Sequence, residues 1–127
     1  MADNLTNTGE NRVLDFVLGL SPTAPTTPLE VALVTVAGDD ASAGTEVVGG
    51  SYARQELTVT SAVDGATSNS TDLVWTDMPA VTIVGWEIWD SAETPVRLWY
   101  GPLNEPKTLS AGDAYKIPAG SLSLSIQ

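Results

Sequence analysis

Hydrophobic and polar residues follow two different spacings along this chain, one before and one after a proline-rich segment. In residues 7–19 the large apolar side chains recur at helical spacing, at Val13, Leu14, Val17 and Leu18. This pattern predicts one short amphipathic helix, with Asn7 and Glu10 resembling a capping box at its start and Gly19 placed to end it. A helix of this length is marginal alone in water, so its apolar face should dock on another surface.

The segment that follows the helix is unfavourable to regular structure. Residues 21–28 contain three prolines, at positions 22, 25 and 28. Proline disfavours helix both at its own position and at the residue before it, so an extended connector is expected. We therefore predict two parts, an N-terminal helix with a Pro-rich arm over residues 1–28 and a β-sandwich domain over residues 29–127.

From Leu29 onward the apolar residues alternate with a period of two, which indicates strands. The predicted strands are 29–36, 54–60, 71–76, 80–89, 96–101, 107–109, 114–117 and 121–126, with a loop over 38–44. In the last of them Leu122, Leu124 and Ile126 share one face. About eight short strands without intervening helices favour an all-β fold, an antiparallel sandwich or jelly-roll-like domain.

Four tryptophans are a large number for a chain of 127 residues. In the predicted strand 80–89, Trp86 falls on the face of Ile88, whereas Trp89 falls on the opposite face with Ile83. Core packing is therefore expected for Trp86. Trp89 and Trp99 are the candidates for an intersubunit or ligand contact, although large aromatic side chains usually belong to the core.

The motif Gly-Gly-Ser-Tyr-Ala-Arg-Gln at residues 49–55 indicates a structural corner. Gly49 and Gly50 permit backbone angles that are closed to other residues. Arg54 is one of five basic residues in a chain with sixteen acidic ones. We expect its planar guanidinium to pair with a carboxylate, with Tyr52 packed beneath it.

The charge of the chain excludes several classes of partner. The formal net charge is -11, which repels the phosphates of a nucleic acid and the surface of an anionic membrane. Neither is expected as a partner. The polar start of the chain lacks the basic and apolar regions of a secretory signal, so synthesis in the cytoplasm of a host is expected.

Candidate chemistry is sparse. The chain has no cysteine and no histidine, so disulfides and thiol catalysis are excluded, as are the commonest general base and transition-metal ligand. The acidic pairs Asp39/Asp40 and Asp72/Asp77 lack the spacing of a calcium loop and are interpreted as solvated charge. We expect no enzyme, no cofactor and no metal site.

A series of short motifs in a fixed order resembles a family of small virion proteins of tailed bacteriophages. The motifs are ENRVLDFVLG at 10–19, GTEV at 44–47, GGSYARQ at 49–55, ATSNS at 66–70, VGWEIWDS at 84–91, GPL at 101–103, KT at 107–108, GD at 112–113 and AGSL at 119–122. Members of this group carry the labels tail fibre, minor tail protein or capsid decoration protein. The chain differs from the commoner members in its Pro-rich segment and its extra tryptophans.

The resemblance implies a structural role and brings no catalytic residues. It leads us to expect a capsid decoration (cement) protein, a homotrimer that binds the major capsid protein on the outer surface of the virion. The alternatives are a tail-fibre component that contacts other tail proteins or a host glycan through Trp89 or Trp99, and a carbohydrate-binding module. The proposed intersubunit or capsid contacts are Val13, Leu14, Val17, Leu18, Tyr52, Arg54, Trp89 and Trp99.

Overall fold

The computed structural model describes residues 4–20 and 23–126. In this part of the chain one helix accompanies ten strands. The elements are β1 (Asn4–Leu5), α1 (Asn7–Val17), β2 (Leu29–Val36), β3 (Thr45–Glu46), β4 (Gln55–Leu57), β5 (Ala66–Ser68), β6 (Leu73–Trp75), β7 (Val81–Trp89), β8 (Arg97–Leu109), β9 (Tyr115–Ile117) and β10 (Ser123–Ser125).

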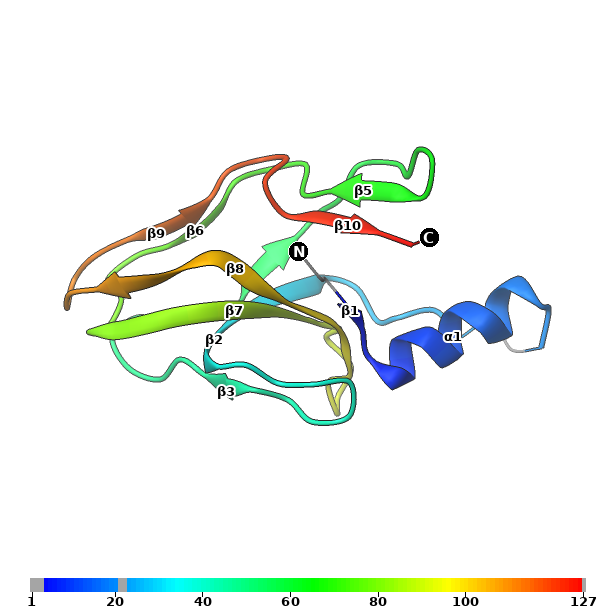
Figure 1. The fold of residues 1–127 in the computed structure, drawn as a ribbon, viewed down its shortest axis with the longest axis horizontal. Coiled ribbons are helices and arrows are strands. Elements are labelled where there is room, and N and C mark those ends of the chain that lie inside the picture. The colour runs from blue at the N-terminus through cyan, green and yellow to red at the C-terminus, as the bar shows by residue number, and fades with distance from the viewer. Residues whose placement is uncertain (1–3, 21–22, 127) are drawn as a thin grey trace.

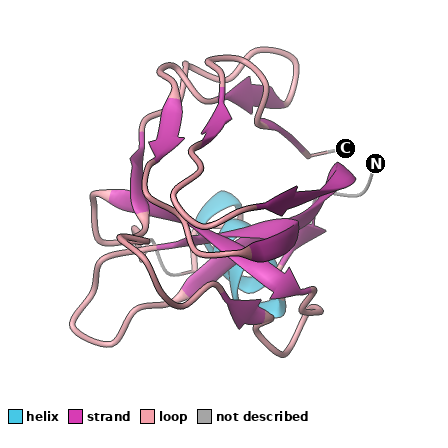
Figure 2. Ribbon diagram, turned by 90° about the vertical axis from the view of Figure 1, so that its left-hand side faces the viewer, coloured by secondary structure: helices cyan, strands magenta, loops and turns pink. Residues whose placement is uncertain are grey.

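The strands form two layers, and every pairing between them is antiparallel. The main sheet has six strands in the order β1-β8-β7-β2-β3, with β4 also paired to β2. Two small sheets, β10-β5 and β6-β9, form the second layer, and Figures 1 and 2 show them facing the main sheet. The predicted all-β antiparallel fold is confirmed. The boundary predicted at residue 28 stays a prediction, although β2 begins at Leu29.

The hydrophobic core lies between the two layers. Its buried side chains from the main sheet are Val31, Leu33, Leu57, Ile83, Trp86, Ile88 and Leu109, and those from the small sheets and their flanking segments are Leu73, Trp75, Ile117, Leu122 and Leu124. Trp86 therefore packs in the core, as predicted. Ile126 does not, because β10 ends at Ser125 and leaves this side chain 49% exposed. The prediction that it shares the buried face of Leu122 and Leu124 was wrong.

An irregularity in the pairing of β7 with β8 changes which side chains share a face. The register of β7 on β8 shifts between Ile83 and Gly85, so the alternation is interrupted there. Ile83 consequently joins the core instead of sharing a face with Trp89, and its predicted orientation was wrong. Trp89 and Glu87 do share a face, since Trp89 Nε1 donates a hydrogen bond of 3.3 Å to Glu87 Oε1.

Strand β8 is longer than the sequence pattern indicated. Residues 96–101 and 107–109 were predicted as separate strands, but one strand runs from Arg97 to Leu109. Gly85 pairs with Pro102 and Ile83 with Lys107, so residues 103–106 bulge out of the ladder. Pro102 and Pro106 fit here because proline, which has no N–H to donate, is tolerated at bulges and sheet edges. Among the described residues, β1 pairs with this edge only at residues 99 and 100.

The start of α1 differs by one residue from the prediction. Thr6, not Asn7, is the N-cap: its backbone is extended, and its hydroxyl oxygen accepts a hydrogen bond of 3.0 Å from Gly9 N. Asn7 is already the first helical residue. A threonine oxygen in this position satisfies one of the unpaired N–H groups of the first turn.

The end of α1 confirms the predicted role of Gly19. The helix ends at Val17, and Gly19 has a left-handed backbone with φ of 75°. Gly19 N donates to Phe16 O at 3.2 Å, and Leu20 N donates to Asp15 O at 2.8 Å. These two bonds form a Schellman motif, which glycine favours because it has no Cβ.

A buried ion pair fastens a loop to the outer face of the main sheet. Glu87 on β7 is 2% exposed and Arg97 on β8 is 8% exposed, and Arg97 Nη1 lies 3.3 Å from Glu87 Oε2. The same carboxylate oxygen accepts a hydrogen bond of 2.7 Å from Gly44 N. Arg97 Nη2 also donates to Asp39 O. The loop over residues 38–44 therefore closes over the pair.

Replacing Arg97 with Met should lower the free energy of unfolding by about 3–5 kcal/mol, because it leaves the Glu87 carboxylate buried without its cation. Urea denaturation at neutral pH measures this change. The exposed pair of Lys116 with Asp72, at 3.3 Å, supplies the matched control. Lys116→Met should have a far smaller effect, since exposed ion pairs contribute little. Equal effects of the two substitutions would contradict the structural role assigned to Arg97.

Candidate interaction surface

The first turn of α1 is held tightly against β8. Thr6 N donates to Leu98 O at 2.9 Å, and Thr6 Oγ1 donates to Arg97 O at 2.8 Å. Gly9 lies so close to the strand that a Cβ on it would be 2.6 Å from Leu98 O. Only glycine permits this approach, so the sequence fixes the position from which the helix leaves the sheet.

Beyond this first turn the helix projects from the end of the sandwich, as Figure 1 shows. Gly9 is the one buried residue among those of α1. Residues 14–20, which we call the distal segment, carry large apolar side chains that are all more than half exposed. They are Leu14 at 57%, Phe16 at 66%, Val17 at 72%, Leu18 at 68% and Leu20 at 76%. Such a concentration of exposed apolar surface is typical of an interaction site.

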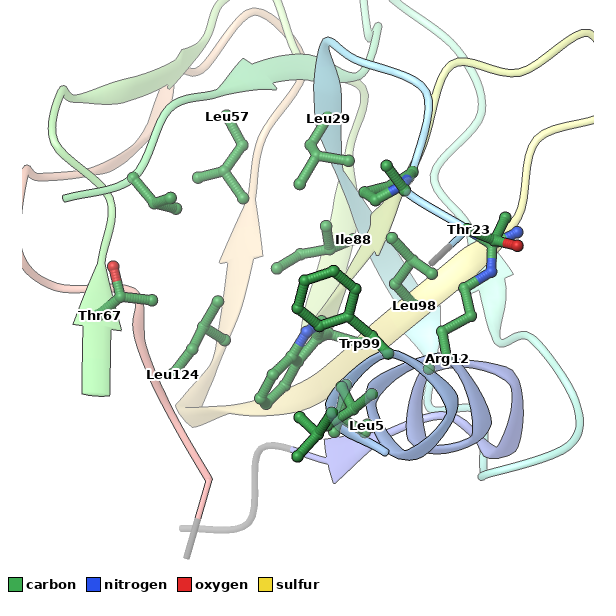
Figure 3. Close-up of a pocket in the computed structure, with 17 residues that line it drawn as sticks. Leu5, Arg12, Thr23, Leu29, Leu57, Thr67, Ile88, Leu98, Trp99 and Leu124 are labelled. Carbon is green, nitrogen blue, oxygen red and sulfur yellow. The ribbon is translucent and has the colours of Figure 1, made fainter. Parts of the chain in front are cut away.

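An open apolar cleft of about 470 Å³ lies between the helix and the two layers of the sandwich. Figure 3 shows α1 on one side of it and Thr67 and Leu124 on the other. We call this space the apolar cleft. It is lined by Leu5, Gly9, Arg12, Val13, Phe16, Val17, Thr23, Ala24, Pro25, Leu29, Leu57, Val59, Thr67, Ile88, Leu98, Trp99 and Leu124.

The floor of the apolar cleft is the end of the hydrophobic core. Leu57, Ile88 and Leu124 belong to the buried core cluster and also line the cleft. The core therefore extends up to the cleft at the end where the helix leaves, and these three side chains stay buried there. Arg12 is the one charged residue among those that line it. A surface of this composition can bury apolar groups but offers little for acid–base chemistry.

The structure divides the predicted helical contacts into two groups. Val13 and Val17 line the apolar cleft together with Trp99, whereas Leu14 and Leu18 do not. Phe16 and Leu20 were not among the predicted contacts, although both are large apolar residues beside the predicted stripe. The four predicted residues therefore do not form one docking face, and their role as contacts stays a prediction.

The Pro-rich arm is tied to the turn between β7 and β8 by a buried carboxylate. Asp90 is 2% exposed, and it accepts hydrogen bonds from the backbone N–H groups of Thr26, Ala92 and Val96 at 3.3, 3.3 and 2.8 Å. Arg12 Nη1 lies 3.9 Å from the same carboxylate. Burial by itself would raise the pKa of Asp90, but the three N–H donors and Arg12 outweigh it and lower the pKa.

Asp90→Asn should lower the free energy of unfolding by about 2 kcal/mol at neutral pH, because the charged form accepts these bonds most strongly. A depressed pKa in the folded state gives stability that is present above the unfolded pKa of about 4 and is lost as the pH falls through the folded value. The stability difference between the wild type and Asp90→Asn should therefore shrink in acid. Urea denaturation across this pH range measures it, and a difference that stays constant with pH would contradict the assignment.

Three predicted contact residues meet in a separate cluster beside β2. Arg54 pairs bidentately with Glu46, with Nη2 to Oε1 at 2.9 Å and Nε to Oε2 at 3.1 Å. Tyr52 donates its hydroxyl to Glu46 at 2.6 Å and accepts a hydrogen bond of 3.0 Å from Leu33 N. The Arg54 guanidinium also lies 4.5 Å from the ring centre of Trp89.

This cluster is the structural corner that the sequence predicted. The hydroxyl of Tyr52 satisfies a main-chain N–H of β2 in the gap between β3 and β4, and burial together with Glu46 raises the pKa of Tyr52 well above its usual value. Gly49 and Gly50 have φ of 116° and 54°, as the motif required. One face of the Trp89 indole is covered by Arg54, so that face is not open to a ligand.

Arg54→Lys should lower the free energy of unfolding by about 1 kcal/mol, because an ammonium cannot bind Glu46 bidentately and stack on Trp89 at once. Chemical denaturation measures the loss. The exposed Lys107 allows the reverse exchange, Lys107→Arg, as a control that should leave stability unchanged. If Arg54→Lys also left the free energy of unfolding unchanged, the cluster would not stabilise this corner.

The described residues contain no group of three or more acidic side chains close enough together to hold a metal ion. Their single helix is too short and too polar to cross a membrane.

Comparison with known proteins places the chain in a family. A search of curated protein sequences found no match. The family model described as podophage GP4 fiber I protein gp80 matches residues 4–125, which include the helix, both layers of the sandwich and all residues of the apolar cleft. The resemblance to phage virion proteins is thereby supported at the level of the family. The chain belongs to the podophage GP4 fiber I protein family and is a structural protein of a phage particle.

Proposed function

We propose that this chain is a fibre subunit of the virion that acts by binding copies of itself and neighbouring particle proteins, without catalysis. The family match over residues 4–125 carries the proposal, because it spans the projecting helix as well as the sandwich. The chain has neither cysteine nor histidine. The largest apolar lining among the described residues belongs to the apolar cleft, where Arg12 is the one charged residue. These features are typical of a subunit that acts by binding and not by catalysis.

The geometry supports a binding role at one end of the molecule. Both the distal segment and the apolar cleft lie at the end of the sandwich from which α1 projects. Exposed apolar surface of this kind lowers the free energy of association when it is removed from water. The strongly acidic remainder of the chain resists non-specific association. We therefore expect neighbouring proteins to bind at the end of the sandwich from which α1 projects.

Capsid decoration, the role first expected from the sequence, stays a prediction. A decoration protein that binds only the assembled shell would stabilise that shell by mass action, and a homotrimer bound to the major capsid protein would do so. The description of the matched family names a fibre protein, and this favours the fibre over the head. The two roles differ in where the chain sits and in how many copies a particle holds.

A host glycan bound through tryptophan receives less support. Trp99 is half-buried in the wall of the apolar cleft, and Arg54 covers one face of Trp89. Neither offers the broad exposed ring on which a sugar would stack. A free carbohydrate-binding module is disfavoured for the same reason.

Location and copy number in purified virions test the proposal. Antibodies against the chain, viewed by electron microscopy, should label the tail, and quantitative mass spectrometry should find far fewer copies than of the major capsid protein. Label distributed over the whole head, with a copy number close to that of the major capsid protein, would overturn the fibre role in favour of decoration. Absence from washed particles would overturn both.

A further inference from the structure

The outward side of α1 carries two leucines that neither the sandwich nor the apolar cleft covers. Leu14 is 57% exposed and Leu18 is 68% exposed, and neither of them lines the apolar cleft. They lie four residues apart, so they follow one another by about one turn on the same face of the helix. We call this pair the outer stripe. Val13 and Phe16 point elsewhere, since both line the apolar cleft.

Acidic groups accompany the outer stripe. Glu10 precedes Leu14 by four residues and Asp15 precedes Leu18 by three, and side chains at these spacings are neighbours on the surface of a helix. The last turn of α1 has no basic residue, so no cation of that turn offsets the partial negative charge at the C-terminal end of the helix. The exposed side of the helix therefore combines apolar side chains with a negative potential.

The cations of the chain are already used within it. Four of the five basic side chains form ion pairs with carboxylates of the same chain. The pairs are Arg12 with Asp90, Arg54 with Glu46, Arg97 with Glu87 and Lys116 with Asp72. The fifth, Lys107, is exposed near the end of β8 that lies away from the contact with α1. The described residues thus hold no group of free cations that a second copy could place against the outer stripe.

The net charge narrows the class of partner further. A formal charge of -11 on each copy makes two copies repel one another. It equally disfavours an anionic membrane and a nucleic acid. An acidic helix with leucines at positions i and i+4 is instead suited to an apolar groove on a protein, with basic residues at the rim of that groove. Opposite charges at the rim would speed the encounter and select the partner.

We propose that the outer stripe docks into an apolar groove, rimmed by lysine or arginine, on a different protein of the particle. Leu14 and Leu18 enter the groove, while Glu10 and Asp15 face its basic rim. The inference rests on the proposed function, under which the chain binds neighbouring particle proteins. It adds the surface that makes this contact and the chemistry of the neighbour that receives it.

Photo-cross-linking in intact particles tests which molecule covers the outer stripe. The photoreactive residue p-benzoylphenylalanine replaces Leu18 in the full-length chain, and purified particles that contain this variant are irradiated. The chain should become joined to a different particle protein, and mass spectrometry should find lysine or arginine close to the cross-linked residue of that protein. The same replacement at Val48, which is 84% exposed and lies outside α1, supplies the control. It should not label that groove.

Charge reversal tests the basic rim. Asp15→Lys places a cation beside the outer stripe and is compatible with the helix, since a cation is favourable near a helix C-terminus. Glu105→Lys makes the same change of charge at an exposed side chain in the bulge of β8. When each variant is produced with an equal amount of wild type, Asp15→Lys should enter particles about tenfold less often, because it brings like charges into contact. Glu105→Lys should enter as often as the wild type.

Quantitative mass spectrometry of purified particles measures both ratios, and urea denaturation establishes that both variants are folded. A cross-link from position 18 to a second copy, or to a site without basic residues, would overturn the inference. So would particles that contain the chain but give no cross-link from position 18, or equal entry of the two charge variants. Each of these results leaves the fibre role standing if the chain is found in the tail. Absence of the wild-type chain from washed particles would remove the proposed function, and the inference with it.

Discussion

The buried pair of Glu87 and Arg97 is the interaction on which the position of the helix and of the apolar cleft depends. A charge at this depth is tolerable only when its partner and its hydrogen bonds are all in place. Arg97 therefore holds Glu87 and the carbonyl of Asp39 with its side chain, while its own carbonyl accepts a hydrogen bond from Thr6. One residue thus joins the sheet, the loop over residues 38–44 and the start of the helix.

The direction of the helix follows from this junction. Thr6 caps α1 and is bonded to β8, Asn7 N donates to Asp40 O at 3.1 Å, and Gly9 brings the first turn against Leu98. Since these contacts lie in the first turn, the remaining turns extend past the sandwich, and the cleft stays open between them and the two layers. The contacts of the first turn therefore determine the positions of both the apolar cleft and the distal segment. Because the first turn of the helix is already held in place, a protein that binds here loses less free energy to the ordering of the helix.

The sequence predicted the long, regularly alternating strands and missed features that depend on a few residues. β2 and β7 were predicted closely, whereas β1 and β3 have two residues each and are too short to show a period. The three-residue β5 was missed because its Ala-Thr-Ser sequence has no large apolar residue. The two strands predicted at 96–101 and 107–109 are one strand, because a bulge at a sheet edge accommodates the prolines between them. For the site, spacing identified the apolar stripe of the helix. The stripe's orientation depends on the close approach of Gly9 to β8, and no local pattern encodes that contact.

The edge of β8 beyond residue 100 limits how copies of the chain can meet. Pro102 and Pro106 interrupt the row of N–H donors along it, and residues 103–106 leave the plane of the ladder. An incoming strand would find neither a straight template nor a full set of donors, so growth of the sheet from one molecule into the next is blocked. At this edge a second protein can therefore be recognised only by the fit of side chains, and such a contact ends where the two fitted surfaces end.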